Sequence, residues 1–206
     1  MYEKFRAVFF ADFPRTNSAA LLDASIVDPK LVELFGVFGG CSFNKGLYRV
    51  LRADQISYWN DLVGSAFPDF KERIKCFSVD WLGRIFAIDT ARIISGRPAV
   101  TLFEPGTGEA LEIPCDVEGF HESEIVDYQE AALAEKFHRE WLDGGGGVPS
   151  FDQCVGYKRP LFLGGKDDLK NLELSNLEVY WVVAAQLISA VKGVPQGKSI
   201  GKVFFD

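Results

Sequence analysis

The 206-residue chain carries a formal net charge of −7, with 48% apolar and 25% charged residues. This composition supports a buried core and excludes disordered and fibrous proteins. The longest apolar stretch, Val179 to Val191, is interrupted by Gln186 and is shorter than the roughly 20 residues of a membrane span, so we expect a buried helix and no membrane contact. The acidic balance disfavours direct nonspecific binding to nucleic acid and favours a basic partner.

The four cysteines, Cys41, Cys76, Cys115 and Cys154, are far apart in the sequence and include no C-x-x-C pair. This spacing favours buried, reduced thiols over a disulfide framework or a zinc site. The amino end lacks the positive charge and the apolar run of a secretion signal. We therefore expect a cytoplasmic protein that needs no metal and no cofactor.

The first half of the chain predicts helices followed by an antiparallel sheet. Helical spacing indicates helices over residues 2–11, 29–37 and 54–67, the second beginning with the capping pair Asp28-Pro29. Short β-rich sections separated by glycine and proline turns predict a meander of neighbouring strands. The predicted strands are 46–51, 74–79, 84–89, 99–103 and 110–113.

The strongest charge asymmetry lies in residues 104–143, which hold 12 acidic residues and two basic ones. From about 122 to 142 the apolar residues Val126, Leu133, Phe137 and Trp141 have helical spacing, which predicts one helix with a buried stripe. Three acids of this helix would then share its outer face. They are Glu124, Asp127 and Glu135. This face is either ordinary solvated helix or a surface that binds a cationic partner.

After the glycines at 144–147, which read as a linker, the pattern predicts a strand over 155–163, a loop over 164–170 and a last helix. Ser175 and Glu178 have the spacing of a capping box, which places the start of that helix at Ser175. We predict an α+β protein in which an antiparallel sheet has flanking helices and a C-terminal helical subdomain follows. The expected regions are residues 1–143 and 144–206.

Motifs of catalysis are missing or incomplete. The stretch from Gly193 to Ser199 has three residues between its glycines where a phosphate loop needs four, and it follows a helix, so we reject it as a nucleotide site. His121 sits at a predicted helix entrance, where neighbouring acids act as caps. His138 is expected on the solvated acidic face with a raised pKa. No serine has the context of a nucleophile elbow.

The section from Cys154 to Gly165, with the later groups 171–173 and 179–181 and Gln186, resembles the C-terminal domain of Tdi-type immunity proteins. Those bacterial proteins neutralise DNase effectors delivered by type VI secretion. Residues 39–52 and 79–89 resemble the GAD-related domain that precedes it, although Asp28-Pro29 replaces the Leu-Pro often found there. The resemblance implies a cytoplasmic antitoxin that is not an enzyme.

A DNase needs a basic cleft for its polyanionic substrate, so an acidic surface can occupy that cleft and exclude DNA. We therefore expect the protein to bind a cognate nuclease toxin and cover its active site. The alternatives are a small hydrolase that uses His121 or His138 with nearby carboxylates, and a general adaptor that binds other proteins. The candidate partner-binding residues are Glu122, Glu124, Asp127, Glu135, Lys166, Asp167 and Asp168, the last three at the polar tip of a loop.

Overall fold

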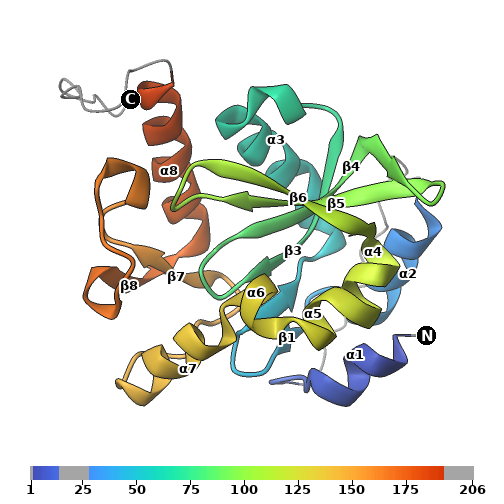
Figure 1. Cartoon of the computed structure of the whole chain (residues 1–206), viewed down its shortest axis with the longest axis horizontal. Helices are drawn as coiled ribbons and strands as arrows, with labels where there is room; N and C mark the ends of the chain where they lie inside the picture. Colours follow the sequence, from blue (N-terminus) through green and yellow to red (C-terminus); the bar gives the residue numbers. More distant parts are fainter. Residues whose placement is uncertain (1, 14–27, 193–206) are drawn as a thin grey trace.

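The computed structural model of the chain describes residues 2–13 and 28–192 (Figure 1). Helix α1 spans Glu3–Val8 and helix α2 spans Pro29–Phe38. The Asp28 carboxylate accepts hydrogen bonds from the backbone N–H groups of Lys30 and Leu31, at 2.9 and 3.0 Å, which satisfies donors that have no partner inside the helix. The predicted start of this helix is confirmed.

A six-stranded antiparallel sheet follows, with its strands paired in chain order from β1 to β6 (Figure 1). This arrangement confirms the predicted meander and the α+β class. The last four strands occupy nearly the predicted positions. The strands are β1 (Ser42–Phe43), β2 (Tyr48–Val50), β3 (Ile74–Asp80), β4 (Ile85–Ile94), β5 (Arg97–Glu104) and β6 (Glu109–Asp116).

Both faces of the sheet are covered. Between β2 and β3 lie the 3₁₀ turn η1 (Ala53–Gln55), helix α3 (Ile56–Ala66) and the turn η2 (Pro68–Phe70). Phe103 packs against Phe67 and Phe70 on this side, with ring centroids 5.1 and 5.0 Å apart. Phe86 follows Ile85, the residue that pairs with Phe103, and therefore points to the opposite face of the sheet. There it packs against Phe120, with ring centroids 4.9 Å apart. Strand side chains on both faces are therefore core.

The acidic segment is not the single helix predicted for residues 122–142, and that prediction is wrong. It forms α4 (Val117–Gly119), the π-helical turn η3 (Phe120–Glu124), α5 (Ile125–Asp127), α6 (Gln129–Leu133) and α7 (Glu135–Asp143). Tyr128 leaves helical geometry, with φ −127° and ψ 42°, and Ala134 is left-handed, with φ 51°.

Tertiary hydrogen bonds explain the second break. The Arg84 guanidinium donates to the carbonyl oxygen of Ala132, and the Trp81 indole N–H donates to that of Leu133, each at 3.0 Å. In a continuous helix these two carbonyl oxygens would accept from backbone N–H groups four residues later in the chain. Here the side-chain donors from the sheet replace those N–H groups. The Lys136 backbone N–H donates instead to the Glu130 carboxylate, at 2.8 Å. The chain can therefore turn at Ala134 without leaving these groups unsatisfied.

The C-terminal part is a hairpin followed by a long helix. Strand β7 (Gln153–Tyr157) pairs with β8 (Leu172–Asn176), and the connection holds the 3₁₀ turns η4 (Leu161–Leu163) and η5 (Leu169–Asn171). Strand β8 was not predicted, and the strand expected over 155–163 ends at Tyr157. Helix α8 spans Leu177–Val191. Its cap is Asn176, whose side chain accepts from the Val179 N–H at 3.0 Å, so the predicted cap at Ser175 is wrong by one residue.

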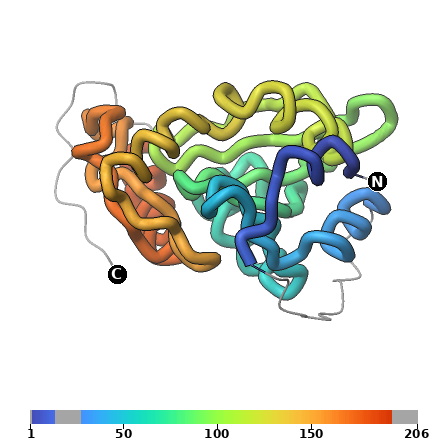
Figure 2. The backbone as a smooth tube through the Cα atoms, turned by 90° about the horizontal axis from the view of Figure 1, so that it is seen from below, coloured from blue at the N-terminus to red at the C-terminus, as the bar shows by residue number. Residues whose placement is uncertain are grey.

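The hairpin and α8 lie at one end of the molecule, beside α7 (Figures 1 and 2). Buried hydrogen bonds join this end to the sheet. The Val155 N–H donates to the Trp81 carbonyl oxygen and the Trp181 indole to that of Gly83, both at 2.7 Å. The buried apolar residues of the two parts form one continuous core.

All four cysteines are free thiols, of which Cys115 is half-buried and the other three are buried, as predicted. Among the described helices, none is both long and apolar enough to cross a membrane. The stretch from Gly193 to Ser199, rejected above as a nucleotide site, lies outside the described residues.

Candidate partner-binding groove

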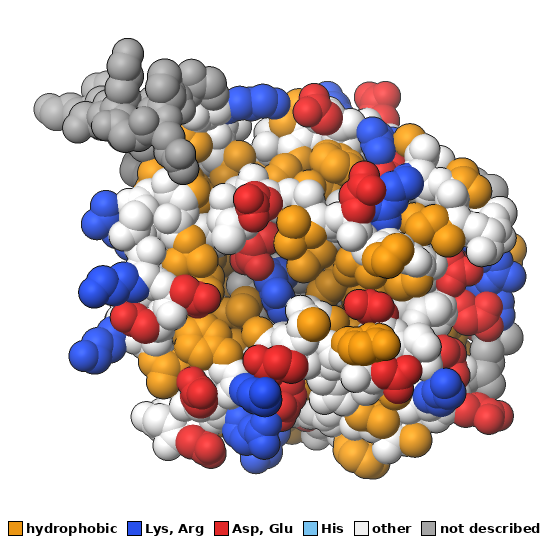
Figure 3. All heavy atoms as spheres, viewed as in Figure 1, with side chains coloured by type: hydrophobic (Ala, Val, Ile, Leu, Met, Phe, Trp, Pro, Cys, Tyr) orange, Lys and Arg blue, Asp and Glu red, His pale blue; other side chains and the backbone are white. Residues whose placement is uncertain are grey.

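The break at Ala134 shapes a groove of about 570 Å³ between α6–α7 and the loop that follows η4. Apolar side chains of Ala134, Phe137 and Leu169 line it together with charged ones. The charged residues are Glu130, Glu140, Asp167, Asp168 and Lys170. Figure 3 shows this face of the molecule, hollowed left of its centre, with acidic side chains around the hollow. We call this feature the acidic groove.

Short hydrogen bonds fix the loop wall of the acidic groove. The Tyr157 hydroxyl donates to the Asp167 carboxylate at 2.7 Å. The Asp168 carboxylate accepts from the Asn171 N–H at 3.0 Å and so caps η5. The Asn171 side-chain amide donates to the carbonyl oxygens of Arg159 and Lys166, both at 2.8 Å. Because these bonds hold the backbone, the two aspartates are presented in a defined place.

The same buried cluster supports both walls. The Arg84 guanidinium, which donates to Ala132 in the helix wall, also contacts Asp80 at 2.6 Å and Glu104 at 3.6 Å. Glu104 begins the turn in which Gly106 lies against the ring of Tyr157, the residue that holds Asp167. Burial raises the pKa of Glu104 to about 7, although the charge of Arg84 opposes this shift. A charge set deep in the sheet thus positions both sides of the groove.

The predicted partner-binding residues fall into two groups in the structure. Asp167 and Asp168 line the acidic groove, and Lys166 is exposed next to them in the chain. The residues Glu122, Glu124, Asp127 and Glu135 do not line it, and no single helix aligns them. Glu135 forms an ion pair with Arg139 at 2.6 Å, while a Glu122 oxygen accepts from the Lys4 N–H at 3.4 Å.

Glu130 and Glu140 are the two groove carboxylates that were not among the predicted partner-binding residues. Both belong to the acidic stretch of 104–143, so the charge count contains them. On one continuous helix they would not meet the loop at 166–168, and only the turn at Ala134 gives α7 its own direction. The charge asymmetry could be read from the sequence, but the pairing of these acids with Asp167 and Asp168 could not.

The surroundings of the two histidines differ from those that the sequence predicted. His138 is buried rather than solvated, with 4% of its surface exposed, and burial lowers its pKa to about 4 instead of raising it. His121 is fully buried, where its two ring nitrogens bond the Tyr48 hydroxyl at 2.8 Å and the Val117 carbonyl oxygen at 2.7 Å. Burial lowers its pKa to about 4 as well. Both rings are therefore neutral at pH 7 and enclosed by protein.

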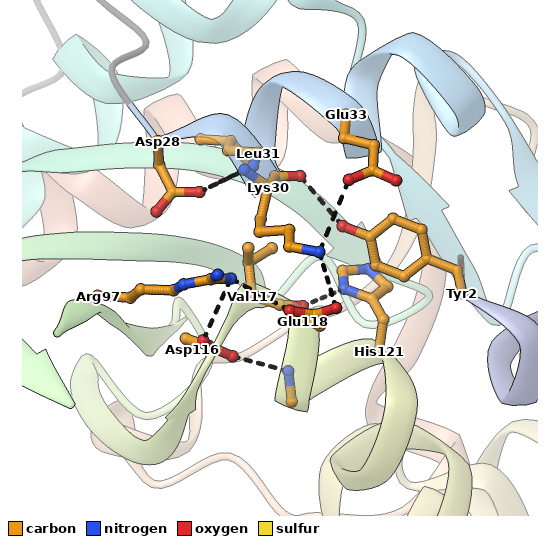
Figure 4. A network of polar contacts seen from close by, with 11 residues as sticks. Tyr2, Asp28, Lys30, Leu31, Glu33, Arg97, Asp116, Val117, Glu118 and His121 are labelled. Carbon is orange, nitrogen blue, oxygen red and sulfur yellow. Dashed lines mark hydrogen bonds and ion pairs between the residues drawn. The ribbon is translucent and has the colours of Figure 1, made fainter. Parts of the chain in front are cut away.

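A second charged cluster lies at the opposite end of the sheet (Figure 4). The Glu118 carboxylate contacts Lys30 at 2.8 Å and Arg97 at 3.1 Å, and the Tyr2 hydroxyl donates to the Lys30 carbonyl oxygen at 3.0 Å. These contacts tie the start of α1 to α2, and α2 and strand β5 to α4. The acids balance the cations within the chain, so this cluster stabilises the fold. Within residues 2–13 and 28–192, no group of three or more His, Cys, Asp or Glu could hold a metal ion.

Comparison with known proteins finds a family that matches the region around the groove. Residues 127–188 match the family described as "T6SS immunity protein Tdi1, C-terminal". This part of the chain is therefore similar to Tdi1-type immunity domains. The resemblance of residues 154–186 to the Tdi-type C-terminal domain is thereby confirmed, whereas the resemblance of residues 39–52 and 79–89 to a GAD-related domain stays a prediction. All eight residues that line the acidic groove lie within the matched range. The family match begins at residue 127, which lies before the predicted domain boundary at 144. The division of the chain into 1–143 and 144–206 therefore stays a prediction.

The fold as a whole also has a solved counterpart. The "Crystal structure of Atu4351 from Agrobacterium tumefaciens" superposes with a TM-score of 0.60 at 14% sequence identity, over 90% of this chain and 89% of that chain. At this identity the likeness concerns the fold alone. No curated protein matches the chain.

Proposed function

We propose that this protein is a type VI immunity protein that binds a cognate DNase toxin and blocks its basic active-site cleft with the acidic groove. The observation that carries the proposal is the position of the groove within residues 127–188, which match the Tdi1 C-terminal family. Four carboxylates and one lysine around an apolar floor fit the long stem and charged end of an arginine or lysine side chain. The partner is then the toxin, with no direct contact to nucleic acid, and the site of action is the cytoplasm.

Rigid hydrogen bonding of the loop wall favours this function. A preorganised surface loses little conformational entropy on binding, so more of the contact energy appears as affinity. Acidic side chains also attract a basic toxin over distances near the Debye length, which accelerates encounter. The adjoining acids Glu124 and Asp127, which do not line the groove, would add to this attraction as rim charges.

The hydrolase alternative loses its main support, because the two histidines it needs are buried and neutral at pH 7. We propose that the protein has no catalytic activity of its own. A general adaptor remains the second candidate from another class, since a groove of this size can hold a peptide segment. We expect a toxin to be encoded beside this protein, and a test with that toxin separates these functions.

The test is a titration of the purified neighbouring toxin with this protein, read as cleavage of plasmid DNA. We expect complete protection near an equimolar ratio and no cleavage of DNA by this protein alone. Binding without protection would favour the adaptor. Intrinsic turnover that disappears in His121→Ala or His138→Ala would favour the hydrolase and contradict the proposal.

A further inference from the structure

The connection between β7 and β8 presents a cluster of cations in a chain whose net charge is −7. Four of its side chains are basic and exposed to solvent, Lys158, Arg159, Lys166 and Lys170. In the part of the chain that the structure describes, none of the four forms an ion pair. Figure 3 shows basic side chains along the left edge of this face, where Figure 1 places the connection. We call these four residues the basic patch.

Asn171 gathers the basic patch around itself. Its side-chain amide donates to the carbonyl oxygens of Arg159 and Lys166, both at 2.8 Å, and its side-chain oxygen accepts from the Arg159 N–H at 3.0 Å. The Lys158 N–H donates to the Asn171 carbonyl oxygen at 2.7 Å, and the Lys158 ammonium group donates to that of Lys170 at 3.0 Å. Like charges that are held together repel one another, and an oppositely charged partner relieves this repulsion.

The basic patch borders the acidic groove. Lys170 lines the groove itself, and Lys166 directly precedes the groove residue Asp167. The sign of the surface charge therefore changes within one loop. A partner of uniform negative charge, such as DNA or an anionic membrane, would be repelled by the groove acids as it reached the patch. A protein surface with a basic and an acidic patch side by side matches both signs.

We propose that the basic patch binds an acidic patch beside the basic cleft of the toxin and so fixes the orientation in which the toxin docks. This inference rests on the proposed function, in which the acidic groove receives that cleft. Two neighbouring patches of opposite sign specify an orientation, because a rotated partner brings like charges together. The groove alone attracts any basic surface, whereas the groove and the basic patch together select one arrangement.

Charge reversal separates this inference from a toxin surface that is basic throughout. Lys166→Glu/Lys170→Glu keeps the hydrogen bonds of the loop, because Lys166 and Lys170 take part in them through backbone carbonyl oxygens. If the toxin surface were basic throughout, two added carboxylates would lower the Kd of the complex. An acidic patch on the toxin predicts the opposite, a Kd that rises about tenfold or more at low salt.

Two further variants complete the measurement. Lys166→Gln/Lys170→Gln removes the charges without adding new ones, and its Kd should rise about threefold. It also tests the inference if the glutamate variant does not fold, which circular dichroism shows. The control Lys4→Glu/Lys71→Glu makes the same change of charge at exposed positions elsewhere, and its Kd should change less than about twofold.

The outcomes distinguish the two proposals. A folded patch variant that binds the neighbouring toxin as tightly as the wild type, or more tightly, overturns this inference and leaves the proposed function standing, because the groove acids are unchanged. A wild type that does not bind the toxin overturns both. A labelled DNA duplex of about 20 base pairs, titrated with up to about 100 µM protein, should show no binding. Binding of that duplex that is lost in Lys166→Glu/Lys170→Glu would assign the basic patch to DNA and contradict the inference.

Discussion

Burial of His121 and His138 makes the stability of the fold depend on pH. Burial lowers the pKa of each imidazole from 6.5 to about 4. Between these values the unfolded chain binds protons that the folded chain does not, so stability is full near pH 7 and falls as the pH drops from 6.5 toward 4. Each histidine contributes on the order of 3 kcal/mol to this loss.

Glu104 acts in the opposite direction. Burial raises the pKa of its carboxyl from 4.5 to about 7, so the folded chain holds a proton that the unfolded chain releases in this range, and stability rises as the pH falls from 7 to 4.5. Glu104→Gln removes this compensation. Urea unfolding should therefore show a larger loss of stability between pH 7 and 4.5 for Glu104→Gln than for the wild type. Equal losses would contradict the assigned burial of Glu104.

Sequence reasoning failed for the histidines because it placed them on a continuous helix. His138 follows Glu135 by three residues, which on such a helix implies a solvated neighbourhood. In the structure the ring lies 5.1 Å from that of Trp81, a residue 57 positions earlier in the chain. Only the fold reveals that contact, so the charge state of a residue could not be derived from its local pattern.

At the scale of elements, Ala134 is the residue at which the chain breaks between α6 and α7. Its left-handed backbone is unfavourable for alanine and readily adopted by glycine. We expect Ala134→Gly to leave stability unchanged or to raise it by up to about 1 kcal/mol. Ala131→Gly, inside α6, is the matched control and should lose about 1 kcal/mol. Urea unfolding measures both, and a similar loss at both positions would contradict the break between α6 and α7.

The elements that could be predicted carry strong local signals. The cap at Asp28, the meander turns and the apolar run of α8 are fixed by neighbouring residues, and they appear where the sequence places them. The break at Ala134 has no glycine or proline to mark it, because its causes are hydrogen bonds from Arg84 and Trp81. Strand β8 was missed for a related reason, since its partner β7 supplies the pairing that its own sequence only weakly favours.

For the whole molecule, Arg49 is the main polar link between the sheet and the C-terminal part. Its buried guanidinium donates to the carbonyl oxygens of Ser150 and Asp80, both at 2.8 Å, and of Phe151 at 3.1 Å, and it also bonds Gln153. These acceptors come from both sides of the junction. Loss of the donor leaves several buried carbonyl groups without a partner.

We expect Arg49→Met to lower the free energy of unfolding by about 3 kcal/mol or more. Arg52→Met removes ion pairs of 3.8 and 3.9 Å and a contact of the guanidinium with the Phe151 ring, 5.0 Å from its centroid. Because this site is half-exposed, the loss should be about 1 kcal/mol. Because the core is continuous, urea unfolding of the wild type should be a single transition. Two separate transitions would instead indicate that residues 1–143 and 144–206 fold independently.

The central claim, that the acidic groove receives a basic toxin, is tested most directly by association kinetics. The variant Glu130→Gln/Glu140→Gln/Asp167→Asn/Asp168→Asn removes four charges and keeps oxygen acceptors for the Lys136 N–H, the Tyr157 hydroxyl and the cap of η5. The control Asp54→Asn/Asp61→Asn/Asp69→Asn/Glu72→Gln removes four exposed charges elsewhere.

The association rate with the neighbouring toxin, measured at low and high salt, should fall about tenfold or more at low salt for the groove variant and much less for the control. The rate of the wild type should also decrease more steeply with salt than that of the groove variant. A folded groove variant that associates and protects DNA as the wild type does at every salt concentration would contradict the account.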